Sequence, residues 1–122
     1  MEDRIRFVEH KGKQILLVDI SHCTSRELEK IALLVPSYVT SEPRGSVLLL
    51  ADFTGAEFDR IAIDRLKEAT VFDRPHLKRS AWVGIETLPA IFFEHIKNFS
   101  RRELPTFKTR EEAMDWLVSA GE

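Results

Sequence analysis

The chain has 122 residues, and its 18 basic and 20 acidic side chains give a formal net charge of -2. With 43% hydrophobic and 31% charged residues it has the composition of a globular protein, and its length predicts one domain over residues 1–122. The near balance of charge argues against a nucleic-acid-binding protein, which usually carries an excess of Lys and Arg. A single cysteine excludes an intramolecular disulfide and a cysteine-built zinc site.

The distribution of apolar residues bears on where the protein acts. No apolar run approaches the roughly 20 residues that a membrane-spanning helix needs. The start of the sequence, Met1-Glu2-Asp3, is too acidic for a signal peptide. We therefore expect a cytoplasmic protein without a membrane span.

The first part of the chain predicts a β-hairpin followed by a helix. Apolar and polar residues alternate over 4–9, as in a half-buried strand, and a glycine turn at 10–13 leads into an apolar strand at 14–19. Between 25 and 35 the apolar residues recur at helical spacing. Pro36 is expected to bend or end this helix near Val35, with a further turn over Tyr38 and Val39 as the alternative.

The rest of the chain alternates strands with helices. Strands are expected at 46–52, 79–85 and 104–107, and helices at 54–74, 88–99 and 113–117. The complete order is β-β-α-β-α-β-α-β-α. Single helices between strands imply right-handed parallel crossovers. We therefore predict an α/β fold with a mostly parallel five-stranded sheet and an antiparallel amino-terminal edge strand.

Four segments carry a resemblance to a known family. They are the run Val-Leu-Leu-Leu-Ala-Asp-Phe-Thr-Gly at 47–55, the basic-then-apolar strand Lys-Arg-Ser-Ala-Trp-Val-Gly at 78–84, the helix end at 96–101, and the strand, polar turn and helix at 107–117 with its Glu-Ala and Trp-Leu pairs. Together they resemble the SpoIIAA-like group of STAS domains, which is related in architecture to the lipid-binding CRAL-TRIO fold. The likeness covers nearly the whole chain and implies a SpoIIAA-like fold.

The resemblance also implies a function. SpoIIAA-like STAS domains include anti-sigma factor antagonists, so the chain is expected to be a non-enzymatic regulatory or protein-interaction module. Its expected partner is a protein of a regulatory kinase or sigma-factor system. Classical members are switched by phosphorylation of a Ser in an Asp-Ser-Ser-Gly context at the start of the second helix. That motif is missing here, since Asp59 is followed by Arg60, and Thr54 is the hydroxyl nearest the expected helix start.

Polar residues follow the expected strands at the points where the strands end. In open parallel α/β sheets, ligands gather outside the carboxyl ends of the strands. We therefore expect one strand-end rim to bind a partner or ligand. Its candidate residues are Asp19, Ser21, His22, Asp52, Thr54, Gly55, Glu57, Asp59 and Arg60, with Glu86 and Thr87 as neighbours. Within the rim, Thr54 is the candidate phosphosite, or an anion site if it lies at a helix N-terminus.

Several of these candidates also have an ordinary structural role. Thr24, Thr54 and Thr109 each precede a Glu by three residues, the spacing of a capping box, so Thr54 is expected to cap the second helix. Asp19 and Asp52 could form a carboxylate pair for acid–base chemistry or magnesium. Such Asp residues more often orient the following loop. We therefore predict no catalytic residue, metal or cofactor.

A second function remains open at this stage. The CRAL-TRIO likeness and a phenylalanine-rich third helix, with Phe92, Phe93 and Phe99, indicate a small-molecule or lipid-binding carrier. Such a carrier needs an apolar cavity of a few hundred Å³. The same helix could instead form a homodimer surface. An enzyme is the weakest alternative, because the sequence has no phosphate loop, nucleophile elbow, metal-ligand cluster or dinucleotide glycine pattern.

Overall fold

The computed structural model describes residues 2–100 and 104–119 and builds them around one mixed β-sheet. Its five strands are β1 (Ile5–His10), β2 (Lys13–Asp19), β3 (Val47–Asp52), β4 (Leu77–Val83) and β5 (Thr106–Phe107). They lie in the order β1-β2-β3-β4-β5, with β1 antiparallel to β2 and every other pair parallel. The predicted α/β fold and strand arrangement are therefore confirmed.

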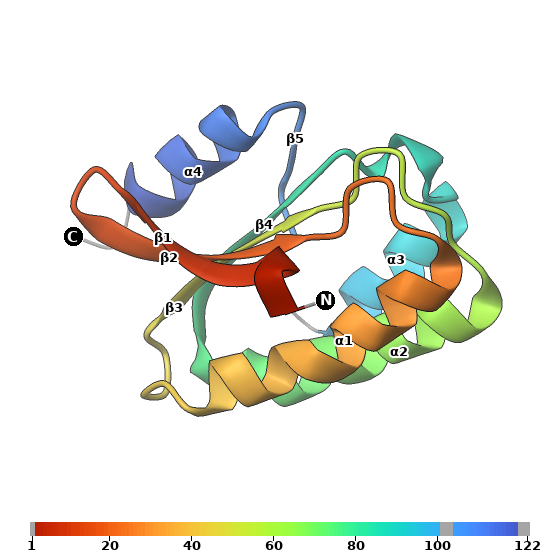
Figure 1. Cartoon of the computed structure of the whole chain (residues 1–122), viewed down its shortest axis with the longest axis horizontal. Coiled ribbons are helices and arrows are strands. Elements are labelled where there is room, and N and C mark those ends of the chain that lie inside the picture. The colour runs from red at the N-terminus through yellow and green to blue at the C-terminus, as the bar shows by residue number, and fades with distance from the viewer. Residues whose placement is uncertain (1, 101–103, 120–122) are drawn as a thin grey trace.

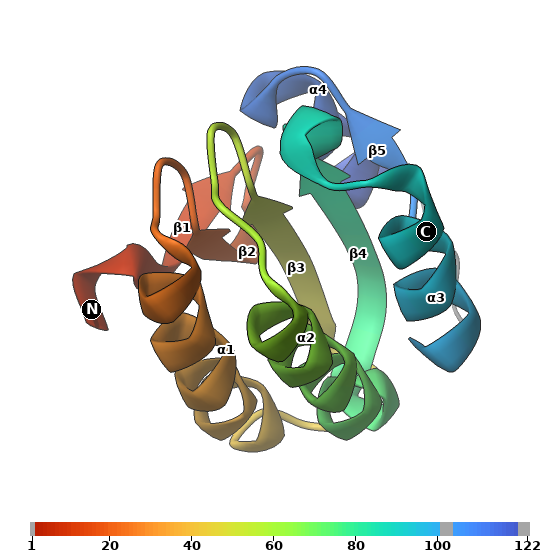
Figure 2. The ribbon, with the colours of Figure 1, turned by 90° about the vertical axis from the view of Figure 1, so that its right-hand side faces the viewer.

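The helices form a layer on each side of the sheet. They are α1 (Ser25–Thr40), α2 (Arg60–Asp73), α3 (Ala90–Ser100) and α4 (Arg110–Ser119), with short 3-10 turns at Glu2–Arg4, Arg74–His76 and Ile85–Thr87. Helices α1, α2 and α3 cover one face and α4 the other (Figures 1 and 2). Right-handed crossovers that always advance toward the same edge put their helices on one face, which explains this division. None of the helices within the described ranges is long and apolar enough to cross a membrane.

The core lies on both sides of the sheet because the central strands are apolar on both faces. Every residue of β3 is buried. One set of strand residues packs under α1, α2 and α3, and includes Leu16, Val18, Leu49 and Trp82. The alternate set packs under α4 and includes Ile15, Leu17, Leu48 and Leu50. The two-residue period of a strand thus sends neighbouring side chains into different halves of the core.

The start of α2 differs from the prediction. The helix begins at Arg60 and not at 54–55, and its N-cap is Asp59, whose carboxylate accepts a hydrogen bond from the backbone N–H of Ala62 at 2.8 Å. The predicted capping box at Thr54 is wrong. The hydroxyl of Thr54 instead donates to the carboxylate of Asp52 at 2.7 Å, so it serves the loop before the helix.

Helix α1 continues through Pro36 to Thr40, so it includes the further turn at Tyr38 and Val39. A proline inside a helix loses one backbone hydrogen bond. Val39 is fully buried in the turn beyond it, and Tyr38 packs against the core, so continuing the helix buries apolar surface that ending it would expose. The expected capping box at Thr24 is confirmed, with reciprocal bonds to Glu27 at 3.2 and 2.9 Å.

Candidate functional site

The ends of the central strands meet at one edge of the sheet. Asp19 of β2 lies opposite Asp52 of β3, and Asp52 lies opposite Val83 of β4 in register. The loops that follow these strands therefore start from the same edge. The order of the strands never reverses along the chain, however, so the described sheet lacks the switch point at which doubly wound folds open a ligand crevice.

One arginine joins the two aspartates. Arg110, the first residue of α4, lies 2.9 Å from Asp19 through Nη2 and donates from Nε to Asp52 at 2.5 Å. Arg4 donates to the backbone carbonyl oxygens of Asp19 and Ser21 at 3.2 and 3.0 Å. Both carboxylates are thus matched by a guanidinium group. Each carboxylate therefore already has a cationic partner within the chain.

Each aspartate also fixes the loop that follows it. The Oδ1 atom of Asp19 accepts from the backbone N–H of Ser21 at 3.1 Å and from its hydroxyl at 2.5 Å. Asp52 repeats the arrangement with Thr54, at 3.0 and 2.7 Å. Burial by itself raises the pKa of Asp19, but the hydrogen bonds from Ser21 and the charges of Arg110 and Arg4 lower that pKa overall. The loop-orienting role therefore describes both residues.

The loops of the rim are bonded to one another. The backbone N–H of His22 donates to the carbonyl oxygen of Thr54 at 2.8 Å, and that of Glu57 donates to Cys23 at 2.9 Å. The hydroxyl of Thr87 donates to the carbonyl oxygen of Ala56 at 2.8 Å. Consequently the three loops after β2, β3 and β4 form one connected layer.

The candidate residues divide into two groups. Asp19, Ser21 and Asp52 are partly or fully buried under the layer. The exposed members are His22, Thr54, Gly55, Glu57, Asp59 and Arg60, and Glu86 and Thr87 are exposed beside them. Asp59 has a structural duty as well, since it caps α2. In the described part of the chain, no group of three His, Cys, Asp or Glu side chains is placed to hold a metal ion.

Sequence reasoning missed the role of Arg110. Arg110 was not among the candidate residues, yet it provides the cation that the two aspartates share. A signal was present, because Arg110 follows Thr109 just after β5 and so leaves the sheet at the same edge as Asp19 and Asp52. Cys23, also at this edge, is buried, and burial raises the pKa of its thiol, which disfavours the reactive thiolate.

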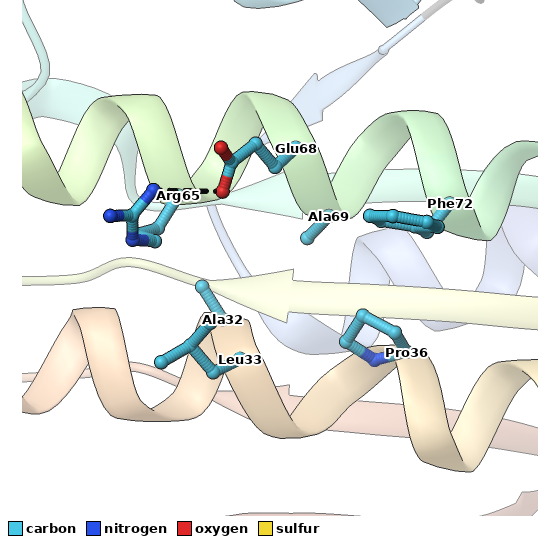
Figure 3. Close-up of a pocket in the computed structure, with 7 residues that line it drawn as sticks. All are labelled: Ala32, Leu33, Pro36, Arg65, Glu68, Ala69 and Phe72. Carbon is cyan, nitrogen blue, oxygen red and sulfur yellow. Dashed lines mark hydrogen bonds and ion pairs between the residues drawn. The ribbon is translucent and has the colours of Figure 1, made fainter.

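A shallow groove runs between α1 and α2, away from the rim (Figure 3). It has a volume of about 240 Å³ and is lined by Ala32, Leu33, Pro36, Arg65, Glu68, Ala69 and Phe72. Leu33 and Phe72 are 65% and 64% exposed, and Arg65 pairs with Glu68 at 2.9 Å. The groove is therefore mostly apolar with one ion pair on its wall.

The phenylalanine-rich helix α3 is less open than its sequence indicates. Phe92 and Phe93 are partly buried and pack against the core, and the Phe93 ring lies 5.8 Å from that of Trp82. Ile91 is exposed. The side chain of Phe99 lies outside the described residues. The two described phenylalanines thus complete the core rather than form an open face.

The chain was compared with protein-family models, with curated proteins and with solved structures, and none of the three comparisons found a match. Arguments about function therefore depend on the geometry of the chain itself.

Proposed function

We propose that this chain is a non-enzymatic regulatory or protein-interaction module that contacts its partner through the exposed part of the strand-end rim. The observation that carries the proposal is the double pairing of Arg110 with Asp19 and Asp52. Arg110 and Arg4, which lies 3.9 Å from Asp19, together balance the charges of the two carboxylates, so the edge offers a fixed, polar surface and not a reactive acid–base pair. The likeness to SpoIIAA-like STAS domains supports the same class of function.

The chemistry of the surface suits a partner with charges of both signs. Glu57 and Arg60 are exposed beside Thr54 and His22. Partners of a kinase or sigma-factor system, as the family resemblance implies, act in the cytoplasm, and we expect this module to act there. We expect no binding to nucleic acid, because the net charge is -2.

Thr54 remains our candidate for modification. It is exposed, and its hydroxyl donates to Asp52. A phosphoryl group on Thr54 would replace this donor with a second anion beside a carboxylate, which repels it. Phosphorylation would therefore loosen the loop before α2, and so alter the surface that we propose the partner contacts.

Charge reversal at the rim tests the proposed surface. We expect Glu57→Lys and Arg60→Glu to lose partners that the wild-type chain retains in quantitative co-purification, with little change in melting temperature. The matched control is Arg44→Glu, which reverses an exposed charge in the loop before β3, at the opposite edge of the sheet. An identical set of partners for all four proteins would overturn the proposal.

A carrier of lipid-sized molecules has less support. The groove between α1 and α2 measures about 240 Å³ but is an open surface feature, since Leu33 and Phe72 on its walls are exposed. Two cavities under α2 measure about 50 and 40 Å³, against the few hundred Å³ that an enclosed ligand of this size requires. A homodimer remains a prediction, and the exposed groove between α1 and α2 is a more open apolar surface for it than α3.

A further inference from the structure

Two buried polar atoms under α2 lack a partner. Among the described residues, the Oδ1 atom of Asp73 and the hydroxyl oxygen of Ser80 have no hydrogen-bond partner, although each residue is only 4% exposed. Buried polar atoms in folded proteins are nearly always bonded to protein, water or a ligand. The two residues line the same small cavity, so whatever satisfies them occupies that space.

The cavity has one polar end and apolar walls. It measures about 40 Å³ and adjoins a second cavity of about 50 Å³, with Leu49, Thr70, Asp73 and Trp82 lining both. Apart from Asp73, Ser80 and Thr70, every described residue along their walls is apolar. None of these described residues carries a positive charge. A buried carboxylate is unfavourable where the described residues put no cation beside it, and the burial of Asp73 raises its pKa to about 7.

The polar groups at this end are suited to accept hydrogen bonds. The hydroxyl of Thr70 donates its proton to the carbonyl oxygen of Lys67 at 2.7 Å, which leaves its lone pairs available. Asp73 supplies a carboxylate oxygen and Ser80 a hydroxyl oxygen. A primary ammonium group donates three hydrogen bonds and carries a positive charge, which complements the carboxylate of Asp73. Trp82 also lines the cavity, and an aromatic ring is a favourable neighbour for a cation or an alkyl chain.

We propose that this cavity binds a short primary alkylammonium, with its head group among Asp73, Ser80 and Thr70 and its carbon chain against Leu49 and Trp82. The small volumes limit the chain to a few carbon atoms. This site lies under α2, away from the rim, so the proposal is independent of the proposed partner surface.

A pair of isosteric probes tests the charge of the ligand. Propylammonium and 1-propanol are titrated at pH 8, where the carboxyl of Asp73 is mostly ionised, into a Trp116→Phe variant in which Trp82 is the remaining tryptophan. We expect saturable fluorescence changes with propylammonium bound at least about tenfold more tightly than propanol, since a charge-assisted bond is roughly twice as strong as a neutral one. The melting temperature should rise with propylammonium.

Three variants complete the experiment. Asp73→Asn should remove the preference for propylammonium, Ser80→Ala should weaken its binding, and Asp64→Asn, an exposed change on the same helix, should leave it unchanged. Should Asp73→Asn fail to fold, Ser80→Ala decides. The proposal would be overturned if the two probes bound equally or if binding survived both cavity variants. It would also be overturned if neither probe bound, which would leave water alone as the occupant.

Discussion

Arg110 is the residue on which the geometry of the rim depends. It is the partner of both Asp19 and Asp52, although it comes 58 positions after the nearer of them in the sequence. Asp52 is almost completely buried, so its charge can be tolerated only next to a cation. The stability of this edge therefore depends on a side chain from the last helix.

Replacing Arg110 tests this dependence. We expect Arg110→Met to lower the free energy of unfolding by about 2–4 kcal/mol, because it leaves a buried carboxylate unpaired. Urea titration measures the change, with Arg60→Met, at an exposed arginine, as the control. Adding Asp52→Asn to Arg110→Met should recover part of the loss. If Arg110→Met proves as stable as Arg60→Met, the ion pairs of Arg110 with Asp19 and Asp52 do not contribute to stability.

Asp73 predicts an unusual dependence of stability on pH. Its pKa is about 7 in the folded chain, against 3.8 for an unperturbed carboxyl, so between these values the folded state holds a proton that the unfolded state has released. This contribution is fully present below pH 3.8 and is lost as the pH rises through about 7. Relative to Asp73→Asn, the wild-type chain should lose up to about 4 kcal/mol between pH 4 and pH 8. Denaturant titrations at each pH measure this difference. The same dependence of the free energy of unfolding on pH in both proteins would contradict the raised pKa of Asp73.

At the scale of elements, two polar residues that lie five positions apart before α2 have different roles. Asp59 caps α2, whereas Thr54 bonds to Asp52 in the preceding loop. Asp59→Ala should therefore cost about 1 kcal/mol of stability and fray the first turn of α2. Glu57→Ala, an exposed acid that does not cap the helix, is the control. Amide hydrogen exchange at residues 60–63 reports the fraying, and equal exchange in both variants would contradict the cap.

The sequence predicted the elements better than their ends. Strands such as 14–19 and 46–52 were predictable because a short, nearly continuous apolar run is typical of a central strand that is buried on both faces. The start of α2 was missed because Thr54 and Asp59 are both good caps, and only the position of Asp52 in space decides between them. The proline left the end of α1 open between Val35 and a further turn, and the burial of Val39 offsets the lost hydrogen bond and extends the helix to Thr40. The meeting of Asp19 with Asp52 was predictable from the strand order. The capping box at Thr109 marked the start of α4 at Arg110, but only the structure shows that the Arg110 side chain reaches both carboxylates.

At the scale of the whole molecule, two glycines show how the rim holds together. Gly84 follows β4 with φ +71°, and a Cβ atom there would meet Thr54 of a different loop, 2.6 Å from its backbone nitrogen. Gly45 has nearly the same backbone angle, φ +68°, but a Cβ atom on it would meet nothing within 4 Å. The two positions thus share the cost of a left-handed backbone and differ only in packing.

The close contact of Gly84 with Thr54 predicts different losses of stability at the two glycines. Gly45→Ala should cost about 1–2 kcal/mol, the usual price of a left-handed conformation for alanine. Gly84→Ala should cost clearly more, and should shift the backbone resonances of Thr54 and its neighbours in NMR spectra. Equal losses of stability for the two variants would mean that the loops after β3 and β4 are not in close contact.

The order of the strands in the sheet follows their order in the chain from β1 to β5. Each new strand joins the edge that the previous strand has just formed, so no segment has to be inserted between two strands that are already paired. During synthesis, the nascent polypeptide could therefore extend its sheet stepwise as it leaves the ribosome. The exception is the closing of the last helix over the opposite face, which brings Arg110 to the aspartates. Assembly of the rim would accordingly be among the final events of folding.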